Sequence, residues 1–166
     1  MRRHRALWIE DGILFECAHL VAPVWMSRRY ELDTATDVSM GLKAIQSNEY
    51  DAVVVDIRLP PGEFPGFVEL YERMGRNKMP ARLGIHLLHS LLGFPDATIH
   101  VEVPHWVTPS RFGVLTVEGE ELVAEELQLC GITVYVVKSV ELPPNTLLEM
   151  LDRLTGKLDK VNGASL

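Results

Sequence analysis

The sequence lacks long apolar runs and an excess of positive charge. A membrane-spanning helix needs about 20 consecutive apolar residues, and no segment approaches this length. The basic start, Met1 to Arg5, is followed only by Ala6 to Ile9 before two acids, which is too short for a signal-peptide core. The formal charge of -7 argues against nonspecific nucleic-acid binding, which requires a basic surface. We therefore expect a cytoplasmic protein that binds neither membranes nor nucleic acids.

Cysteine is also scarce, because only Cys17 and Cys130 occur. Both have apolar neighbours at helical spacing, so we expect buried free thiols in a reducing compartment. The 166 residues suffice for one domain with a core but not for two ordinary domains. The hydrophobic content of 47% and charged content of 23% are typical of a globular protein.

The most informative stretch is the apolar run at 52–55, which Asp51 precedes and Asp56 follows. Four consecutive apolar residues, three of them β-branched, predict a strand that is buried on both faces, as in a parallel sheet. Asp56 would then lie at the carboxyl edge of the sheet, where open α/β folds bind ligands. A single Asp after a strand is most often only a turn residue. Its interpretation therefore depends on its neighbours in the fold.

Strand-like and helix-like segments alternate along the chain. The patterns predict strands at 6–9, 30–35, 52–55, 112–116 and 132–137, and helices at 13–29, 37–45, 64–74, 81–92, 118–129 and 144–154. Pro23 should shorten the first helix, and Asp37 should cap the second. Segment 98–103 fits either an extra strand or an extended loop. The β-α-β order predicts an α/β fold with a parallel sheet and right-handed crossovers.

The expected strands end at Glu10-Asp11, Asp56, Thr116 and Lys138. Parallel strands bring these ends to one edge of the sheet. Three carboxylates would repel one another without a cation, and oxygen ligands suit Mg²⁺ better than Zn²⁺. Lys138 and the Thr116 hydroxyl can each bind a phosphoryl oxygen, and Asp56 can be the nucleophile that forms an aspartyl phosphate.

These residues resemble those of a response-regulator receiver domain of two-component signalling, in the manner of the chemotaxis regulators. The resemblance implies a doubly wound, flavodoxin-like five-stranded sheet of order 2-1-3-4-5 with helices on both faces. It also implies that Asp56 is the phosphoacceptor, that Thr116 and Lys138 assist it, and that Thr116 and Tyr135 are switch residues. The metal ligands implied for Mg²⁺ are Glu10, Asp11, Asp56 and the backbone carbonyl of Arg58.

The chain departs from the family pattern in three places. The stretch between Asp56 and Thr116 is long, so we expect a receiver domain over 1–155 with insertions near 63–82 and 97–110, and a polar tail at 156–166. Ser139 follows Lys138 where the family commonly has a cis-proline. Arg58 is large and cationic, and we expect it to overhang the phosphoryl group.

The histidine clusters and segment 63–110 each have more than one interpretation. His86 and His89, or His100, Glu102 and His105, could bind a transition metal, but no further ligand has a recognisable spacing. The many apolar residues of 63–110 predict either an interface with another chain or packing on the domain's own sheet.

We expect a stand-alone receiver that is phosphorylated by a sensor histidine kinase or phosphotransfer protein. Its output would pass through a downstream protein partner or a homodimer. The resemblance implies no turnover beyond self-phosphorylation and self-dephosphorylation at Asp56. The first alternative is a receiver-like interaction module that does not use phosphorylation. A haloacid-dehalogenase-like phosphatase is the second, and Arg58 opposes it by replacing the second acid of the Asp-x-Asp motif.

Overall fold

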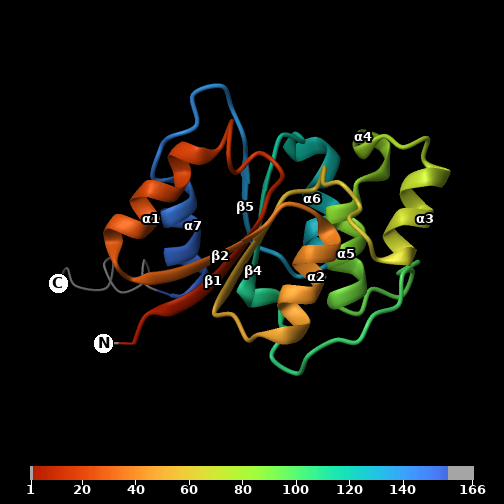
Figure 1. Cartoon of the computed structure of the whole chain (residues 1–166), viewed down its shortest axis with the longest axis horizontal. Coiled ribbons are helices and arrows are strands. Elements are labelled where there is room, and N and C mark those ends of the chain that lie inside the picture. The colour runs from red at the N-terminus through yellow and green to blue at the C-terminus, as the bar shows by residue number, and fades with distance from the viewer. Residues whose placement is uncertain (1, 157–166) are drawn as a thin grey trace.

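The computed structural model describes residues 2–156, and its centre is a five-stranded sheet (Figure 1). The strands are β1 (His4–Ile9), β2 (Tyr30–Ala35), β3 (Ala52–Val55), β4 (Phe112–Thr116) and β5 (Val134–Val137). Their order is β2-β1-β3-β4-β5, and all four neighbouring pairs are parallel. This is the doubly wound, flavodoxin-like sheet that the resemblance to receiver domains implies.

Helices cover both faces of the sheet. They are α1 (Val21–Ser27), α2 (Val38–Ser47), α3 (Pro65–Arg73), α4 (Lys78–Ala81), α5 (Leu83–Leu91), α6 (Glu120–Leu129) and α7 (Thr146–Leu154), with short 3-10 helices η1 (Ala18–Leu20) and η2 (Pro109–Arg111). In Figure 1, α1 and α7 lie on one side of the sheet, and α2, α5 and α6 lie on the other. Helices α3 and α4 lie outside α5. Within residues 2–156, no helix is long and apolar enough to cross a membrane.

Strand β3 lies in the middle of the sheet, and all four of its residues are fully inaccessible to solvent. Val53 and Val55 pack into the core cluster on the α2–α5–α6 side. Ala52 and Val54 pack into the cluster on the α1–α7 side. The unbroken apolar run is therefore explained by burial on both faces.

The first helix is shorter than predicted. Residues 11–17 form turns, in which the Gly12 carbonyl accepts the amides of Phe15 and Cys17, and α1 begins only at Val21. Pro23 lies in the first turn of α1, where its missing amide donor costs no helical hydrogen bond. Leu14 is 77% exposed, so the apolar residues whose helical spacing predicted an earlier start do not all face the core.

Segment 63–110 packs on the domain's own sheet. Phe67, Ile99 and Trp106 are buried in the same cluster as β3, with Leu70 beside them. Residues 98–103 form no strand and run as an extended loop, held in part where Gln46 Nε2 donates to the carbonyl of Glu102. Burial against its own domain is therefore the better interpretation of this segment's apolar residues.

Two further expectations concern the cysteines and the C-terminal tail. Cys17 and Cys130 are buried and form no disulfide, as predicted. The expected polar tail lies outside the described residues, except for Gly156.

Candidate functional site

Three carboxylates meet where β1 and β3 end. Glu10 directly follows β1 and Asp56 directly follows β3, and the Asp56 amide still donates to the Ile9 carbonyl at 3.0 Å. Glu10 and Asp56 are buried, whereas Asp11 is partly exposed. One oxygen from each of the three lies within 4.8 Å of the others. Parallel strands deliver these groups to one edge, as the sequence predicts.

Lys138 places a largely buried ammonium between two of these carboxylates. It follows β5, and its Nζ donates to Asp56 Oδ2 at 2.9 Å and to Glu10 Oε2. Burial disfavours the ammonium, but the charges of Asp56 and Glu10 outweigh this and raise the Lys138 pKa. Lys138 therefore stays protonated and holds the site together.

Glu10 is buried, and this burial raises the pKa of its carboxyl to about 7. Repulsion from Asp56 acts in the same direction, while Lys138 and the Gly12 amide oppose it. The unfavourable charge density at this position is the physical reason to expect a further cation.

A second lysine reaches the site from α4. Lys78 Nζ donates to Asp11 Oδ2 at 2.5 Å. The sequence did not predict that Lys78 belongs to the site, because the polar stretch 75–78 indicates only the end of a helix. Asp11 and Lys78 are 67 positions apart, and no local pattern signals their contact.

Thr116 is the last residue of β4, and it is fully buried. Its backbone carbonyl accepts the Lys138 amide at 2.6 Å, which sets these two site residues side by side. The Thr116 hydroxyl accepts the Glu118 amide at 3.4 Å. Tyr135 is half-buried and packs against the larger core cluster, and its switch role stays a prediction.

Arg58 points toward Glu118. Its Nε lies 3.2 Å from Glu118 Oε1, and Arg82 Nη2 lies 2.9 Å from the other oxygen of the same carboxylate. Glu118 lies within the predicted helix 118–129, but its side chain is buried and it precedes α6. Two arginines satisfy its charge, which makes the burial tolerable. The role of the Arg58 carbonyl as a metal ligand stays a prediction.

The three carboxylates fit a divalent cation such as Mg²⁺, which takes oxygen ligands. Their full charge exceeds that of Lys138 and Lys78 by one. Among the described residues, they are also the one group of three or more acidic, His or Cys side chains close enough to share an ion. His86 and His89 belong to no such group: His86 Nδ1 lies 3.3 Å from Thr98 Oγ1, and His89 stacks on Phe94.

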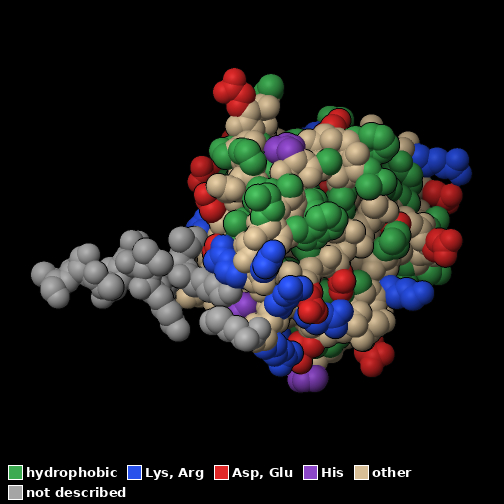
Figure 2. All heavy atoms as spheres, turned by 60° about the vertical axis from the view of Figure 1, so that its left-hand side comes forward, with side chains coloured by type: hydrophobic (Ala, Val, Ile, Leu, Met, Phe, Trp, Pro, Cys, Tyr) green, Lys and Arg blue, Asp and Glu red, His purple; other side chains and the backbone are tan. Residues whose placement is uncertain are grey.

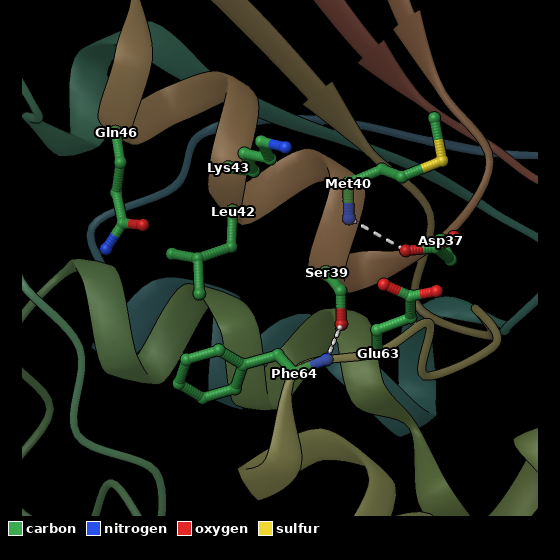
Figure 3. A pocket seen from close by; sticks show the side chains of 8 residues that line it. All are labelled: Asp37, Ser39, Met40, Leu42, Lys43, Gln46, Glu63 and Phe64. Carbon is green, nitrogen blue, oxygen red and sulfur yellow. Dashed lines mark hydrogen bonds between the residues drawn. The ribbon is translucent and has the colours of Figure 1, made fainter.

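A cavity of about 560 Å³ lies apart from the acidic site, between α2 and the start of α3 (Figure 3). Two of its polar lining residues, Asp37 and Ser39, have structural roles. Asp37 caps α2 by accepting the Met40 amide at 2.7 Å, and the Ser39 hydroxyl accepts the Phe64 amide at 2.8 Å. Asp37 is thus the N-cap that the sequence predicts.

Comparison with known proteins gives a structural answer only. No protein-family model matches the chain, and no curated protein does. Among solved structures, the CheY-like receiver domain protein of Methanospirillum hungatei JF-1 is 19% identical with a TM-score of 0.58, covering 96% of this chain and 99% of its own. The response regulatory domain of mrkE from Klebsiella pneumoniae is 18% identical with a TM-score of 0.58, covering 94% and 98%.

A third similar structure contains a metal ion. It is the receiver domain of sensor histidine kinase PA1611 from Pseudomonas aeruginosa PAO1, with magnesium coordinated in the active-site cleft. It is 16% identical with a TM-score of 0.53, and the alignment covers 93% of this chain and 99% of that one. The chain therefore has the fold of response-regulator receiver domains.

Proposed function

We propose that the chain is a response-regulator receiver that accepts a phosphoryl group on Asp56 with the help of Mg²⁺. The observation that carries this proposal is the direct contact of Lys138 Nζ with Asp56 beside Glu10 and Asp11. A buried lysine and three carboxylates at one sheet edge supply the positioning and charge stabilisation that phosphoryl transfer requires.

The residues have distinct roles in this proposal. Asp56 Oδ1 accepts the Ile57 amide at 2.7 Å, which fixes the carboxylate, while Oδ2 accepts Lys138. A carboxylate oxygen forms the new bond to phosphorus as the bond from phosphorus to the donor breaks, and the donor keeps that electron pair. Lys138 can then transfer its hydrogen bond to a phosphoryl oxygen. The cation would be held by Glu10, Asp11 and Asp56 and would neutralise phosphoryl charge.

The donor would be a sensor histidine kinase or a phosphotransfer protein, and the proposed location is the cytoplasm. The output would pass through a downstream protein or a second copy of the chain. In Figure 2, which brings the α1 side toward the viewer, hydrophobic side chains gather on the upper part of the face. Leu14, Phe15, Trp25 and Met26, from α1 and the loop before it, are each more than 60% exposed. Such exposed apolar side chains support a protein-binding role.

Beryllofluoride provides the test, because it mimics a phosphoryl group on a carboxylate. We expect a protein-bound ¹⁹F NMR signal when wild type is mixed with beryllofluoride and Mg²⁺. Asp56→Asn removes the attacking charge and should show no bound signal. An equal bound signal in Asp56→Asn, or one that persists in excess EDTA, would contradict the proposal.

One observation favours the alternative of a phosphorylation-independent interaction module. Each of the three carboxylates already has a lysine partner, so Lys78 and Lys138 offset two of the three negative charges without any ligand. In that case beryllofluoride would give no bound signal with either protein. The same experiment therefore separates the two functions.

A further inference from the structure

Lys78 is the residue that reaches the carboxylate cluster from outside the strand ends. It begins α4, and the side chains of Lys78 and Asp11 are 47% and 26% exposed. The Lys138–Asp56 pair is much less accessible to solvent, since these side chains are 12% and 5% exposed. Lys78 therefore lies at the exposed outer edge of the carboxylate cluster, while Lys138 lies inside it.

The position of Lys78 conflicts with a bound metal. Its Nζ lies 2.5 Å from Asp11 Oδ2, and Asp11 contributes one of the three oxygens that lie within 4.8 Å of one another. An ammonium and a divalent cation on the same carboxylate repel each other strongly at such distances. A cation that takes Asp11 as a ligand therefore competes with Lys78 for this carboxylate.

The start of α4 is held loosely enough to allow displacement of Lys78. Residues 72–80 are exposed, and Ala81 is the buried residue of α4. Beyond it, Arg82 is fixed by Glu118 and Glu126. The Lys78–Asp11 pair ties the first turn of α4 to the strand ends, and α4 also packs on α3. Figure 1 shows α4 at the level where the strands end.

We infer that Lys78 is an internal competitor of the metal: it occupies Asp11 in the metal-free protein and releases α4 when the cation binds. This inference rests on the proposed function, because it requires Mg²⁺ at this site. Its consequence is that α4 is tied to the strand ends through Asp11 only while no cation occupies the site.

Isothermal titration with Mg²⁺ alone tests the competition. Lys78→Gln should bind Mg²⁺ roughly two- to fivefold more tightly than wild type, the factor expected when a partly exposed ion pair no longer competes. Lys43→Gln is the matched control, since Lys43 is exposed on α2 and lines the separate cavity. It removes the same charge and should leave the affinity within error of wild type.

Amide hydrogen exchange supplies the second readout. Mg²⁺ should speed exchange across residues 78–82 in wild type, whereas in Lys78→Gln exchange should be fast already and unaffected by Mg²⁺. If wild type and Lys78→Gln bind Mg²⁺ equally, or if Lys43→Gln gains as much affinity, the inference is wrong although the proposed function stands. If wild type does not bind Mg²⁺ at all, both the magnesium site and the inference fail.

Discussion

At the scale of single residues, buried charge explains the site. Lys138 and Asp56 are largely inaccessible, and their burial is tolerated because the two charges lie 2.9 Å apart and Lys138 also pairs with Glu10. Glu118 is buried in the same way between Arg58 and Arg82. Separation of the partners would leave a buried charge uncompensated. These ion pairs therefore restrict the movement of the loops after β3 and β4, which carry Asp56, Arg58 and Glu118.

Two half-buried histidines, His86 and His89, should make the protein sensitive to acid. Burial lowers the pKa of His86 and of His89, and repulsion from His89 adds to the effect on His86. Their neutral forms therefore stabilise the fold above the ordinary pKa of 6.5, and this contribution is lost as the pH falls through that value toward the lower folded pKa. Within residues 2–156, His89 Nε2 is buried without a hydrogen-bond partner, so its charging is especially unfavourable.

We expect His86→Gln/His89→Gln to lose less unfolding free energy than wild type between neutral pH and pH values below 6.5. Urea denaturation across this interval provides the measurement. His105→Gln is the control, because His105 is exposed, and its curve should follow that of wild type. A double variant with the same pH dependence as wild type would show that these histidines charge freely in the folded state.

At the scale of elements, predictions succeeded where the hydrophobic pattern is set by burial. Strand β3 was predictable because both of its faces are covered, and α2 because Asp37 caps an amphipathic segment. Residues 13–17 were wrongly predicted as helix, because Leu14 is 77% exposed although its spacing is helical. Helix α4 was missed because it follows residues with positive φ, Gly75 and Arg76, whose turn has no hydrophobic signal.

Segment 63–110 should contribute to stability through Trp106. This side chain is 6% exposed, stacks parallel to Phe112 at 6.5 Å between ring centroids and meets Tyr50 edge-on. We expect Trp106→Ala to lose about 3–5 kcal/mol of unfolding free energy in urea denaturation. Trp25 is 67% exposed, so Trp25→Ala should change it by less than about 0.5 kcal/mol. Equal small losses in both variants would mean that this segment is not part of the core.

At the scale of the whole molecule, the fold and the site depend on the same feature, the parallel order of the strands. Because β1, β3, β4 and β5 are neighbours that run in one direction, Glu10, Asp56, Thr116 and Lys138 reach one edge. That arrangement was predictable from residue types at strand ends. The contacts of Lys78 with Asp11 and of Glu118 with Arg58 and Arg82 were not predictable, because they join loops that are far apart in the sequence.

The most direct test of the account is phosphorylation of the chain itself. Wild type is incubated with acetyl phosphate and Mg²⁺, and its intact mass is measured. We predict a gain of one phosphoryl group that is absent in Asp56→Asn and absent in wild type with excess EDTA, while Asp51→Asn, altered just before β3, is still labelled. No gain in wild type, or equal labelling of wild type and Asp56→Asn, would contradict the central claim that Asp56 is the phosphoacceptor.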